Sequence, residues 1–537
     1  MGRSFQTDIA DPNHFVITLE LVPGASYQGL ALDTVKKIAK DAQDDGRVSA
    51  VTITDNPGGN PSLSPDVIGK EIVDRGMDVI VHFTCRDANR GGIESRALQL
   101  ARMGMRNILA LTGDYSGRGF GGQGMPVFDM DSTSLICFLN MLGERHRREA
   151  GPEESFRTGC AVSPFKSTEA ETYAQYYKLC KKIAAGASFV ITQVGYEVRK
   201  FRELLQILQV FKLPVSVLGS VYVLRPPAAK IMNRGAIPGA VVTGNLLESV
   251  MQEWGDREQG ETAAIERAAR LAVVLKGLGY HGIHVGGVHR SFATLEAILD
   301  RMEQIENRWR EFLPDFDYPQ KDGFYVFEET SSDTSISGIL PAQSSRAALL
   351  EKTHFQGLRL LHEFFFRFES PLAPALKSVC TRLDATPGGR QLAFLIEDPL
   401  KKWLLSCKGC GDCGIQNLAF LCPESQCPKH IRNGACGGSS DGRCEVYPDR
   451  PCVWVRVYNR LAAVGRAHEM ARTFVAPRNW ALNGTSSWLN FHLRRDHQST
   501  GCDIAERCNT EGSCSFRRQS NTATPANATQ PALRQSR

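Results

Sequence analysis

Eight cysteines are concentrated near the end of the chain, with a spacing that suits metal or cluster binding. The first three form a C-x2-C-x2-C motif interspersed with glycines, which is typical of iron–sulfur ligation. Structural zinc held by four thiolates is the alternative. We predict two sets of four ligands and favour at least one [4Fe–4S] cluster over zinc alone. The cysteines are Cys407, Cys410, Cys413, Cys422, Cys427, Cys436, Cys444 and Cys452.

A carboxylate stands within the first apolar run of the chain, Thr18-Leu19-Glu20-Leu21. Burying an unpaired carboxylate is costly. Glu20 is therefore either an active-site acid with a raised pKa or a structural carboxylate paired with a buried Arg or Lys.

Polar residues also follow other apolar runs. Because the carboxyl ends of parallel strands form the functional face of a (β/α)8 barrel, these residues are site candidates. A histidine metal site is disfavoured, since His281 and His284 are three apart on a strand and point to opposite faces. The glycine-rich stretch 117–124 is only a weak signal of dinucleotide binding. We interpret it instead as a mobile loop that covers a ligand. The candidates are Thr54, His82, Gly113, Asp114, Gln193 and Arg290.

Eight strand-like apolar runs alternate with amphipathic segments over the first 310 residues. This alternation predicts a (β/α)8 barrel, with a doubly wound sheet as the runner-up. Additional helices are expected around Glu248–Leu278. The runs are His14–Val22, Val48–Thr54, Met77–Thr84, Arg106–Thr112, Thr158–Ser163, Ser188–Gln193, Pro214–Gly219 and Gly282–Gly286.

Composition divides the rest of the chain. We predict a barrel over residues 1–313, a linker over 314–345, a cysteine-rich α-helical domain over 346–497 and a disordered tail over 498–537. The tail holds Cys502, Cys508 and Cys514, interpreted as free thiols. A net charge of +5 over 537 residues is too dilute to indicate nucleic-acid or membrane binding. We expect a cytoplasmic protein, since no targeting segment or apolar span is visible. We also expect a homo-oligomer.

Several motifs together resemble the methylenetetrahydrofolate reductase family. They are Leu19-Glu20, His82-Phe83-Thr84, Leu111-Thr112-Gly113-Asp114, the stretch 185–193 and Val288-His289-Arg290, in the family's order over about residues 12–310. The cysteine-rich region resembles the accessory C-terminal domain of some bacterial members. The resemblance implies FAD at the carboxyl ends of the barrel strands and reduction of 5,10-methylenetetrahydrofolate to 5-methyltetrahydrofolate. NAD(P)H or ferredoxin would be the electron donor.

The resemblance also implies roles for individual residues. Glu20 matches the acid that assists opening of the folate ring, and Asp114 matches the carboxylate near flavin and pterin. Gln193 matches a substrate contact, and Arg290 matches a residue near nicotinamide or folate. Thr54, His82, Gly113 and Lys182 match flavin-contacting positions. A non-catalytic subunit that docks a redox partner and relays electrons is the alternative function.

Overall fold

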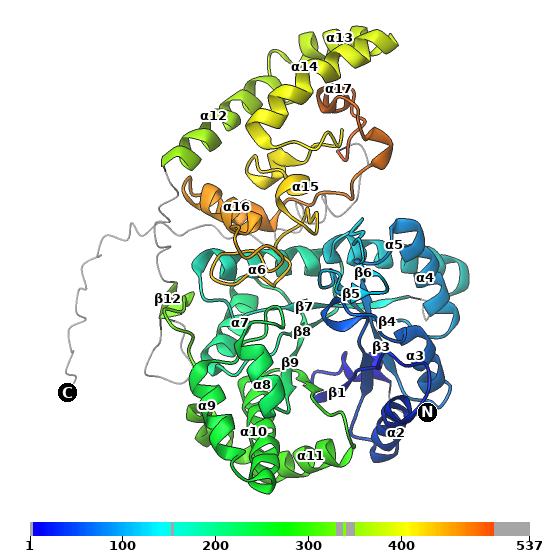
Figure 1. The fold of residues 1–537 in the computed structure, drawn as a ribbon, viewed down its shortest axis with the longest axis vertical. Coiled ribbons are helices and arrows are strands. Elements are labelled where there is room, and N and C mark those ends of the chain that lie inside the picture. Colours follow the sequence, from blue (N-terminus) through cyan, green and yellow to red (C-terminus); the bar gives the residue numbers. More distant parts are fainter. Residues whose placement is uncertain (1–3, 152–154, 329–336, 340–348, 499–537) are drawn as a thin grey trace, which may run out of the picture.

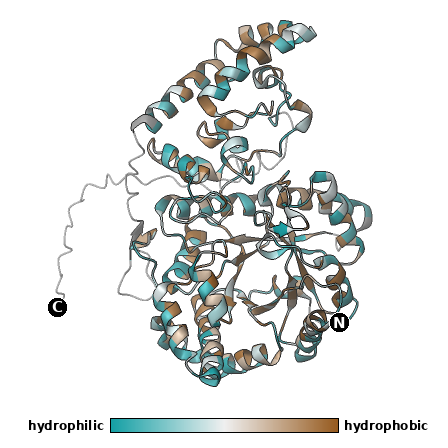
Figure 2. Cartoon of the chain, viewed as in Figure 1, coloured by the Kyte–Doolittle hydropathy of each residue, from teal (hydrophilic) through white to brown (hydrophobic). Residues whose placement is uncertain are grey.

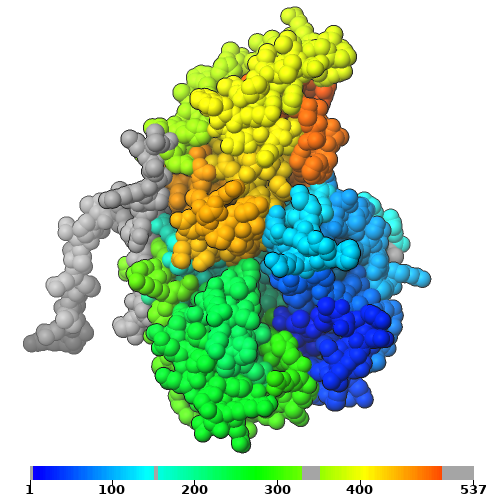
Figure 3. Space-filling model, viewed as in Figure 1, coloured from blue at the N-terminus to red at the C-terminus, as the bar shows by residue number. Residues whose placement is uncertain are grey.

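The computed structural model of the chain describes residues 4–151, 155–328, 337–339 and 349–498 (Figure 1). Apart from Gln498, the predicted disordered tail lies outside the described residues, as do Cys502, Cys508 and Cys514. A barrel forms the larger part of the molecule, and the cysteine-rich domain rests on it (Figures 1 and 3).

Eight parallel strands close into one barrel in the order β1-β10-β9-β8-β7-β4-β3-β2. Closure is completed by β1, which pairs with both β2 and β10. The predicted (β/α)8 barrel is confirmed, and the doubly wound alternative is wrong. Each strand overlaps one of the predicted apolar runs, although β9 continues to Tyr222, beyond the predicted end at Gly219. The strands are β1 (Val16–Leu21), β2 (Ala50–Ile53), β3 (Val79–Thr84), β4 (Asn107–Leu111), β7 (Arg157–Val162), β8 (Phe189–Thr192), β9 (Ser216–Tyr222) and β10 (Gly282–Gly286).

Helices surround the apolar strands (Figure 2). Three of them, α8 to α10, fill the long interval between β9 and β10, where the sequence predicts additional helices. Several of the surrounding helices are capped by a side chain just before their first turn. For example, the Asp131 carboxylate accepts hydrogen bonds from backbone amides at the start of α5. The helices are α2 (Leu30–Asp45), α3 (Pro65–Val73), α4 (Arg90–Arg102), α5 (Ser132–Ala150), α6 (Glu169–Ala184), α7 (Val198–Val210), α8 (Pro226–Asn233), α9 (Gly244–Glu253), α10 (Arg257–Leu278) and α11 (Ala293–Ile305).

The barrel interior changes from apolar to polar along its axis. Near the amino ends of the strands, Val16, Ile80 and Phe189 pack together with Phe5 of α1 (Phe5–Asp8). Phe5 is fully buried and meets the Phe189 ring edge-on, with 5.3 Å between centroids. Toward the carboxyl ends, buried polar side chains such as His284 replace the apolar layer. The apolar end supplies core stability and leaves the opposite end free for chemistry.

The first part of the predicted linker packs against the barrel. It begins in the 3-10 segment η3 (Glu306–Phe316) and continues to β11 (Phe327–Glu328), which pairs with β12 (Ser337–Ile339). Val326 is 1% exposed, and its amide donates to Glu203 of α7. Residues 314–328 are therefore an extension of the barrel surface.

The cysteine-rich domain has little regular structure around its cysteines. Helix α16 packs against α6 of the barrel, with α14 and α13 farther away (Figure 1). No helix in the described part of the chain is long and apolar enough to cross a membrane. The elements are α12 (Leu349–Phe365), α13 (Ala373–Asp384), α14 (Pro387–Leu405), η4 (Ile415–Leu418), α15 (Pro423–Gln426), α16 (Val453–Ala462), η5 (Ala467–Ala471), η6 (Trp480–Leu482) and α17 (Ser487–His492).

Candidate active site and cysteine sites

Glu20 lies near the carboxyl end of β1, beside His284 of the neighbouring strand β10. Its Oε2 is 3.8 Å from Nε2 of His284, whose Nδ1 is 3.0 Å from the Thr18 hydroxyl. Burial raises the pKa of Glu20, but contact with His284 and the nearby imidazoles of His82 and His289 more than offset it. The pKa is therefore lowered below its ordinary value. The expectation of a raised pKa is wrong, and the ionic partner is histidine rather than Arg or Lys.

Thr54 and His82 lie at adjacent strand ends and carry unused polar atoms. Thr54 follows β2, and His82 is on β3. Among the described residues, neither Thr54 Oγ1 nor His82 Nε2 has a hydrogen-bond partner, although both atoms are buried. Burial lowers the pKa of His82 to about 4, so its imidazole is neutral at physiological pH. Two buried polar atoms without partners are available to a ligand in the mouth.

Gly113 and Asp114 form the turn after β4. Gly113 has a φ of +92°, and a Cβ there would lie 3.0 Å from Cβ of Thr84, so this position requires glycine. The Asp114 carboxylate accepts a 2.9 Å hydrogen bond from the Gly58 amide in the turn after β2. The buried Arg86 guanidinium donates to the carbonyl of Asn56. The turns after neighbouring strands thus hold one another at the mouth.

The three remaining predicted residues differ in their surroundings. Gln193 follows β8, and its amide donates to Pro238 O at 3.0 Å. Arg290 is exposed at the start of the segment leading into α11. Lys182 is buried on α6, where it donates to Ala161 O at 2.7 Å, and burial lowers its pKa to about 8. Lys182 is therefore engaged with the β7 backbone, whereas Arg290 is accessible.

The glycine-rich stretch after β4 forms a small exposed hairpin, β5 (Arg118–Gly119) with β6 (Gly122–Gln123). Phe120 at its tip is fully exposed. Because the hairpin does not open a helix, it lacks the strand–turn–helix context of a dinucleotide fingerprint.

The eight cysteines fall into two groups of four, each lining its own cavity. The first-set cysteines, Cys407, Cys410, Cys413 and Cys422, line one cavity with Lys401 and Arg432. The second-set cysteines, Cys427, Cys436, Cys444 and Cys452, line another with Lys429 and Glu445. Within the described parts of the chain, no three His, Cys, Asp or Glu side chains are arranged to hold one metal ion.

The first-set sulfurs receive hydrogen bonds from a buried lysine and from a backbone amide. Lys401 Nζ is 3.3 Å from Cys413 Sγ, and the Gly409 amide is 3.3 Å from Cys407 Sγ. Burial raises the pKa of Cys410 to about 12, and the same cause raises that of Cys427 in the second set to about 12. These thiols therefore stay protonated at neutral pH unless a cation replaces the proton.

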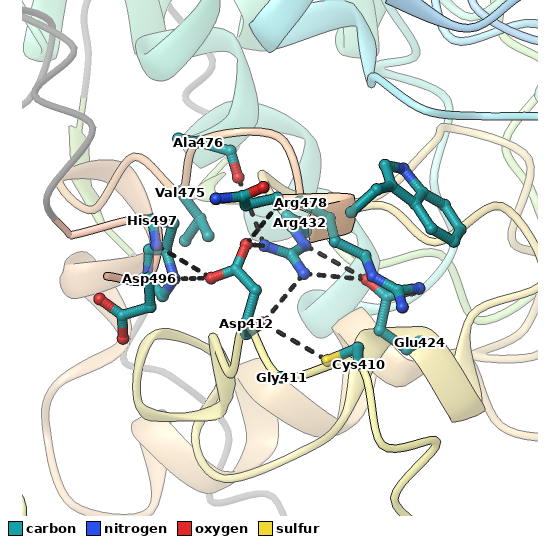
Figure 4. Close-up of polar contacts among 12 residues, drawn as sticks. Cys410, Gly411, Asp412, Glu424, Arg432, Val475, Ala476, Arg478, Asp496 and His497 are labelled. Carbon is teal, nitrogen blue, oxygen red and sulfur yellow. Dashed lines mark hydrogen bonds and ion pairs between the residues drawn. The ribbon is translucent and has the colours of Figure 1, made fainter. Parts of the chain in front are cut away.

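A buried ionic network supports the first set (Figure 4). Arg432 lies between Asp412 and Glu424, 3.1 Å from each carboxylate. His497 Nδ1 is 2.7 Å from the other oxygen of Asp412, and Cys410 Sγ contacts the Asp412 carbonyl. Although burial raises the pKa of Asp412, its contacts with His497 and Arg432 lower it well below the ordinary range. Charge pairing thus adds to the apolar residues that this domain buries, such as Leu418, Ile431 and Val475.

The cysteine-rich domain contacts the barrel mouth directly. Asp131 Oδ2, at the start of α5, accepts hydrogen bonds from the Arg432 and Asn433 amides at 3.2 and 3.0 Å. Lys166, after β7, donates to the carbonyls of Gly437 and Ser439, both at 2.5 Å. These contacts place the second set beside the ends of β4 and β7.

Sequence reasoning missed how His284 and Lys429 contribute to these contacts. His284 contacts Thr18 and lies near Glu20, whereas His281, which precedes β10, contacts Asp8 O. The three-residue spacing of these histidines gives no sign of either partner. Lys429 lies between two cysteines and gives no sequence signal of reaching a barrel strand.

The closed barrel, with its acid and unused polar atoms at the strand ends, defines a (β/α)8 protein with an enzyme-like mouth. A family model described as "Methylenetetrahydrofolate reductase" matches residues 6–303, and one described as "Methylene-tetrahydrofolate reductase C terminal" matches 387–481. Because the first covers more than half of the chain, this protein belongs to the methylenetetrahydrofolate reductase family.

Individual relatives match shorter regions. A "Probable methylenetetrahydrofolate reductase (NADPH)" from Caenorhabditis elegans is 28% identical over 204 residues, covering 36% of this chain and 28% of that protein. A "5,10-methylenetetrahydrofolate reductase" from Pectobacterium carotovorum subsp. carotovorum is 31% identical over 127 residues, covering 24% of this chain and 37% of that protein. The matched regions thus span less than two fifths of these relatives' lengths.

A solved structure is also similar. It is described as an uncharacterized protein from Clostridium thermocellum that binds two copies of 5-methyl-5,6,7,8-tetrahydrofolic acid. The match covers 56% of this chain and 99% of that chain, at 12% identity and a TM-score of 0.37.

Proposed function

We propose that this protein uses a bound flavin to reduce 5,10-methylenetetrahydrofolate to 5-methyltetrahydrofolate. The observation that carries the proposal is Glu20, held by His284 in the mouth of a barrel of this family. Thr54 and His82 support it, because they offer buried polar atoms at the strand ends beside it.

The residues at the mouth fit a flavin. Thr54 Oγ1 and His82 Nε2 provide hydrogen-bonding groups without partners among the described residues, and Gly113 leaves the β4 turn free of a side chain. Thr54, His82, Gly113 and Asp114 would contact the flavin, whereas Lys182 would support the nearby β7 backbone. A bound flavin would supply hydride to the folate, and the protein would fix its orientation.

Glu20 would supply the proton that opening of the folate ring requires. At neutral pH its lowered pKa keeps it ionised in the free protein, with the His284 imidazole 3.8 Å away. A proton taken up by the Glu20 carboxylate would be donated to the folate nitrogen as the ring C–N bond breaks. Thr18 contacts the other ring nitrogen of His284 and so orients the imidazole.

Gln193 and Arg290 would bind substrates. Gln193 is held beside the Pro238 loop near β8, and the exposed Arg290 guanidinium can meet an anionic group of the folate or of a nicotinamide nucleotide. Gln193, held by Pro238, would set the orientation of the substrate, whereas the exposed Arg290 would contribute charge.

The two cysteine sets would each hold a metal centre. Four cysteines line each cavity, and Lys401 and the Gly409 amide donate hydrogen bonds to first-set sulfurs. Donors to the first-set sulfurs and the C-x2-C-x2-C spacing favour at least one [4Fe–4S] cluster, with structural zinc as the alternative. Such clusters would give a ferredoxin-type donor a route to the flavin, whereas NAD(P)H would reduce it directly.

The visible spectrum of anaerobically purified protein tests this proposal, together with metal analysis and assays with NADH, NADPH and a reduced viologen. We expect two resolved flavin bands, iron at one or more atoms per chain, and formation of methyltetrahydrofolate. Flavin-free protein that forms no product after incubation with FAD would contradict the reductase activity. Stoichiometric zinc without iron would contradict only the electron relay.

A further inference from the structure

Lys429 belongs to the cysteine-rich domain, but its side chain ends at the barrel mouth. Its ammonium donates a 2.8 Å hydrogen bond to the carbonyl of Gly113, in the turn after β4. The side chain is only 4% exposed, and Nζ lies 5.9 Å from the centroid of the Phe128 ring. A buried positive charge thus lies at the strand end that carries Asp114, although Lys429 follows Gly113 by 316 positions.

The framework of the second cysteine set holds Lys429 in this position. Glu445 forms an ion pair with Lys429, and its Oε1 is 3.3 Å from Cys436 Sγ. Gly438 makes room for that carboxylate, because a Cβ there would overlap a Glu445 oxygen. Lys429 follows Cys427 by two positions, and Glu445 follows Cys444 directly. The loops that carry the second-set cysteines therefore also position the Lys429–Glu445 pair.

The barrel fixes the same loop from the other side. Lys166 binds two carbonyls in the 437–439 stretch, and Lys178 of α6 donates to Gly434 O at 3.1 Å. The Asp131 carboxylate accepts two backbone hydrogen bonds from residues 432 and 433. Because Lys429 is restrained from both domains, its charge has a fixed place at the mouth.

We propose that Lys429 is a positioning residue of the barrel's flavin site and favours the reduced form of the flavin. The inference rests on the proposed flavin-dependent function. Reduction increases the electron density of the flavin, and the Asp114 carboxylate opposes added negative charge nearby. The Lys429 ammonium donates to the Gly113 carbonyl of the same turn. Its charge offsets both its ion-pair partner Glu445 and the nearby Asp114 carboxylate, so its loss would leave two negative charges uncompensated. The barrel thus supplies the turn that carries Asp114, and the cysteine-rich domain supplies the positive charge that offsets this carboxylate.

Lys429→Met tests this role, with Lys178→Met as the matched control. Both lysines are buried and donate to a backbone carbonyl of the other domain, but only Lys429 reaches the β4 turn. Affinities for oxidised and reduced FAD would be measured by titration of the deflavinated full-length protein. For Lys429→Met we expect binding of reduced FAD to weaken at least about tenfold more than binding of oxidised FAD. For a two-electron couple this lowers the midpoint potential by about 30 mV.

The controls separate charge from docking. Lys178→Met should lower the melting temperature without changing the ratio of the two affinities, and Lys429→Arg should restore most of that ratio. Equal ratios in Lys429→Met and wild type, or the same change in Lys178→Met, would overturn the role of Lys429. A wild-type protein that binds no flavin would instead overturn the proposed function.

A comparison of cysteine variants tests the second-set framework. Cys436→Ala should move the affinity ratio away from the wild-type value, because it removes the thiol that contacts Glu445, the ion-pair partner of Lys429. Cys413→Ser, in the first set, should leave the ratio at the wild-type value. If both variants changed the ratio equally, the specific link between the second set and Lys429 would be wrong.

Discussion

The barrel and the cysteine-rich domain are organised by different interactions. The barrel sheet is continuous, and its strand ends hold Glu20, His82 and Asp114 on a framework of backbone hydrogen bonds. Between Cys407 and Cys452 the other domain has only η4 and α15 as regular helical elements among described residues, and a buried ionic network supports it. Its helix α14 also exposes apolar side chains, including Trp403 at 82% exposure.

This difference shows what each region requires in order to be ordered. Ladder hydrogen bonds and apolar layers order the barrel without a ligand. The eight closely spaced thiols of the other domain, most of them with a pKa raised by burial, would instead be completed by the proposed metal, which would replace their protons. On the proposed function, a cofactor added to the barrel would fill a prepared site, whereas a metal added to the other domain would also stabilise its fold. Experiments can test whether the cysteine-rich domain depends on a metal for its order while the barrel does not.

Metal removal should produce the largest effect. Structural metal sites contribute about 10 kcal/mol to folding, so anaerobic chelation should abolish hydrogen-exchange protection in residues 407–452. Protection in β3 and β4 should stay unchanged. Retained protection in 407–452, with metal loss confirmed by elemental analysis, would contradict the contrast between the two regions.

Glu20→Gln should have the largest kinetic effect. Without a proton donor at this position, reduction of methylenetetrahydrofolate by pre-reduced enzyme should slow about 10²–10⁴-fold. Flavin reduction by the electron donor should remain near the wild-type rate, and stopped-flow absorbance measures both half-reactions. Equal slowing of both would show that Glu20 supports flavin binding instead.

Asp412→Asn should destabilise the cysteine-rich domain by about 3–5 kcal/mol, because it leaves Arg432 poorly compensated. Asp384→Asn, which breaks the more exposed pair with Arg495, should cost about 0–1 kcal/mol. Denaturant titration gives both values.

Since the pKa of Asp412 is lowered on folding, its stabilising effect is complete above pH about 4 and is lost at lower pH. A pH-independent difference between wild type and Asp412→Asn across this range would argue against an ionic contribution.

The folate half-reaction should accelerate as the pH falls from 8 toward 5. The pKa of Glu20 lies below its ordinary value, so the protonated fraction grows by up to about tenfold per pH unit. Single-turnover rates measure this dependence. It should be absent from Glu20→Gln, and an unchanged slope in that variant would assign the proton to another group.

Arg290→Ala should have the smallest effect. Because Arg290 is exposed at the rim, its loss should raise a substrate KM by about tenfold and leave the melting temperature unchanged. Steady-state kinetics and thermal unfolding check this pair of outcomes. A large fall in melting temperature with unchanged KM would assign Arg290 a structural role.

The sequence predicts the strands of the barrel more completely than it predicts which side chains contact one another. The eight apolar runs match the eight strands because burial on both faces imposes a continuous apolar pattern. Glu20 stands out as a carboxylate in such a run, but its partner His284 is brought beside it only by barrel closure. The direction of its pKa shift follows from surrounding imidazoles, which no local pattern specifies. The reach of Lys429 into the mouth depends in the same way on domain docking.

Barrel closure also imposes a delay during synthesis. Thr18 of β1 pairs with His284 of β10, 266 positions later. At about 5–20 residues per second, β1 leaves the ribosome about 13–53 s before its partner. Through that interval β1 has an unpaired edge, which is a template for association with other chains. Slowed translation should therefore increase the time during which nascent chains need a chaperone.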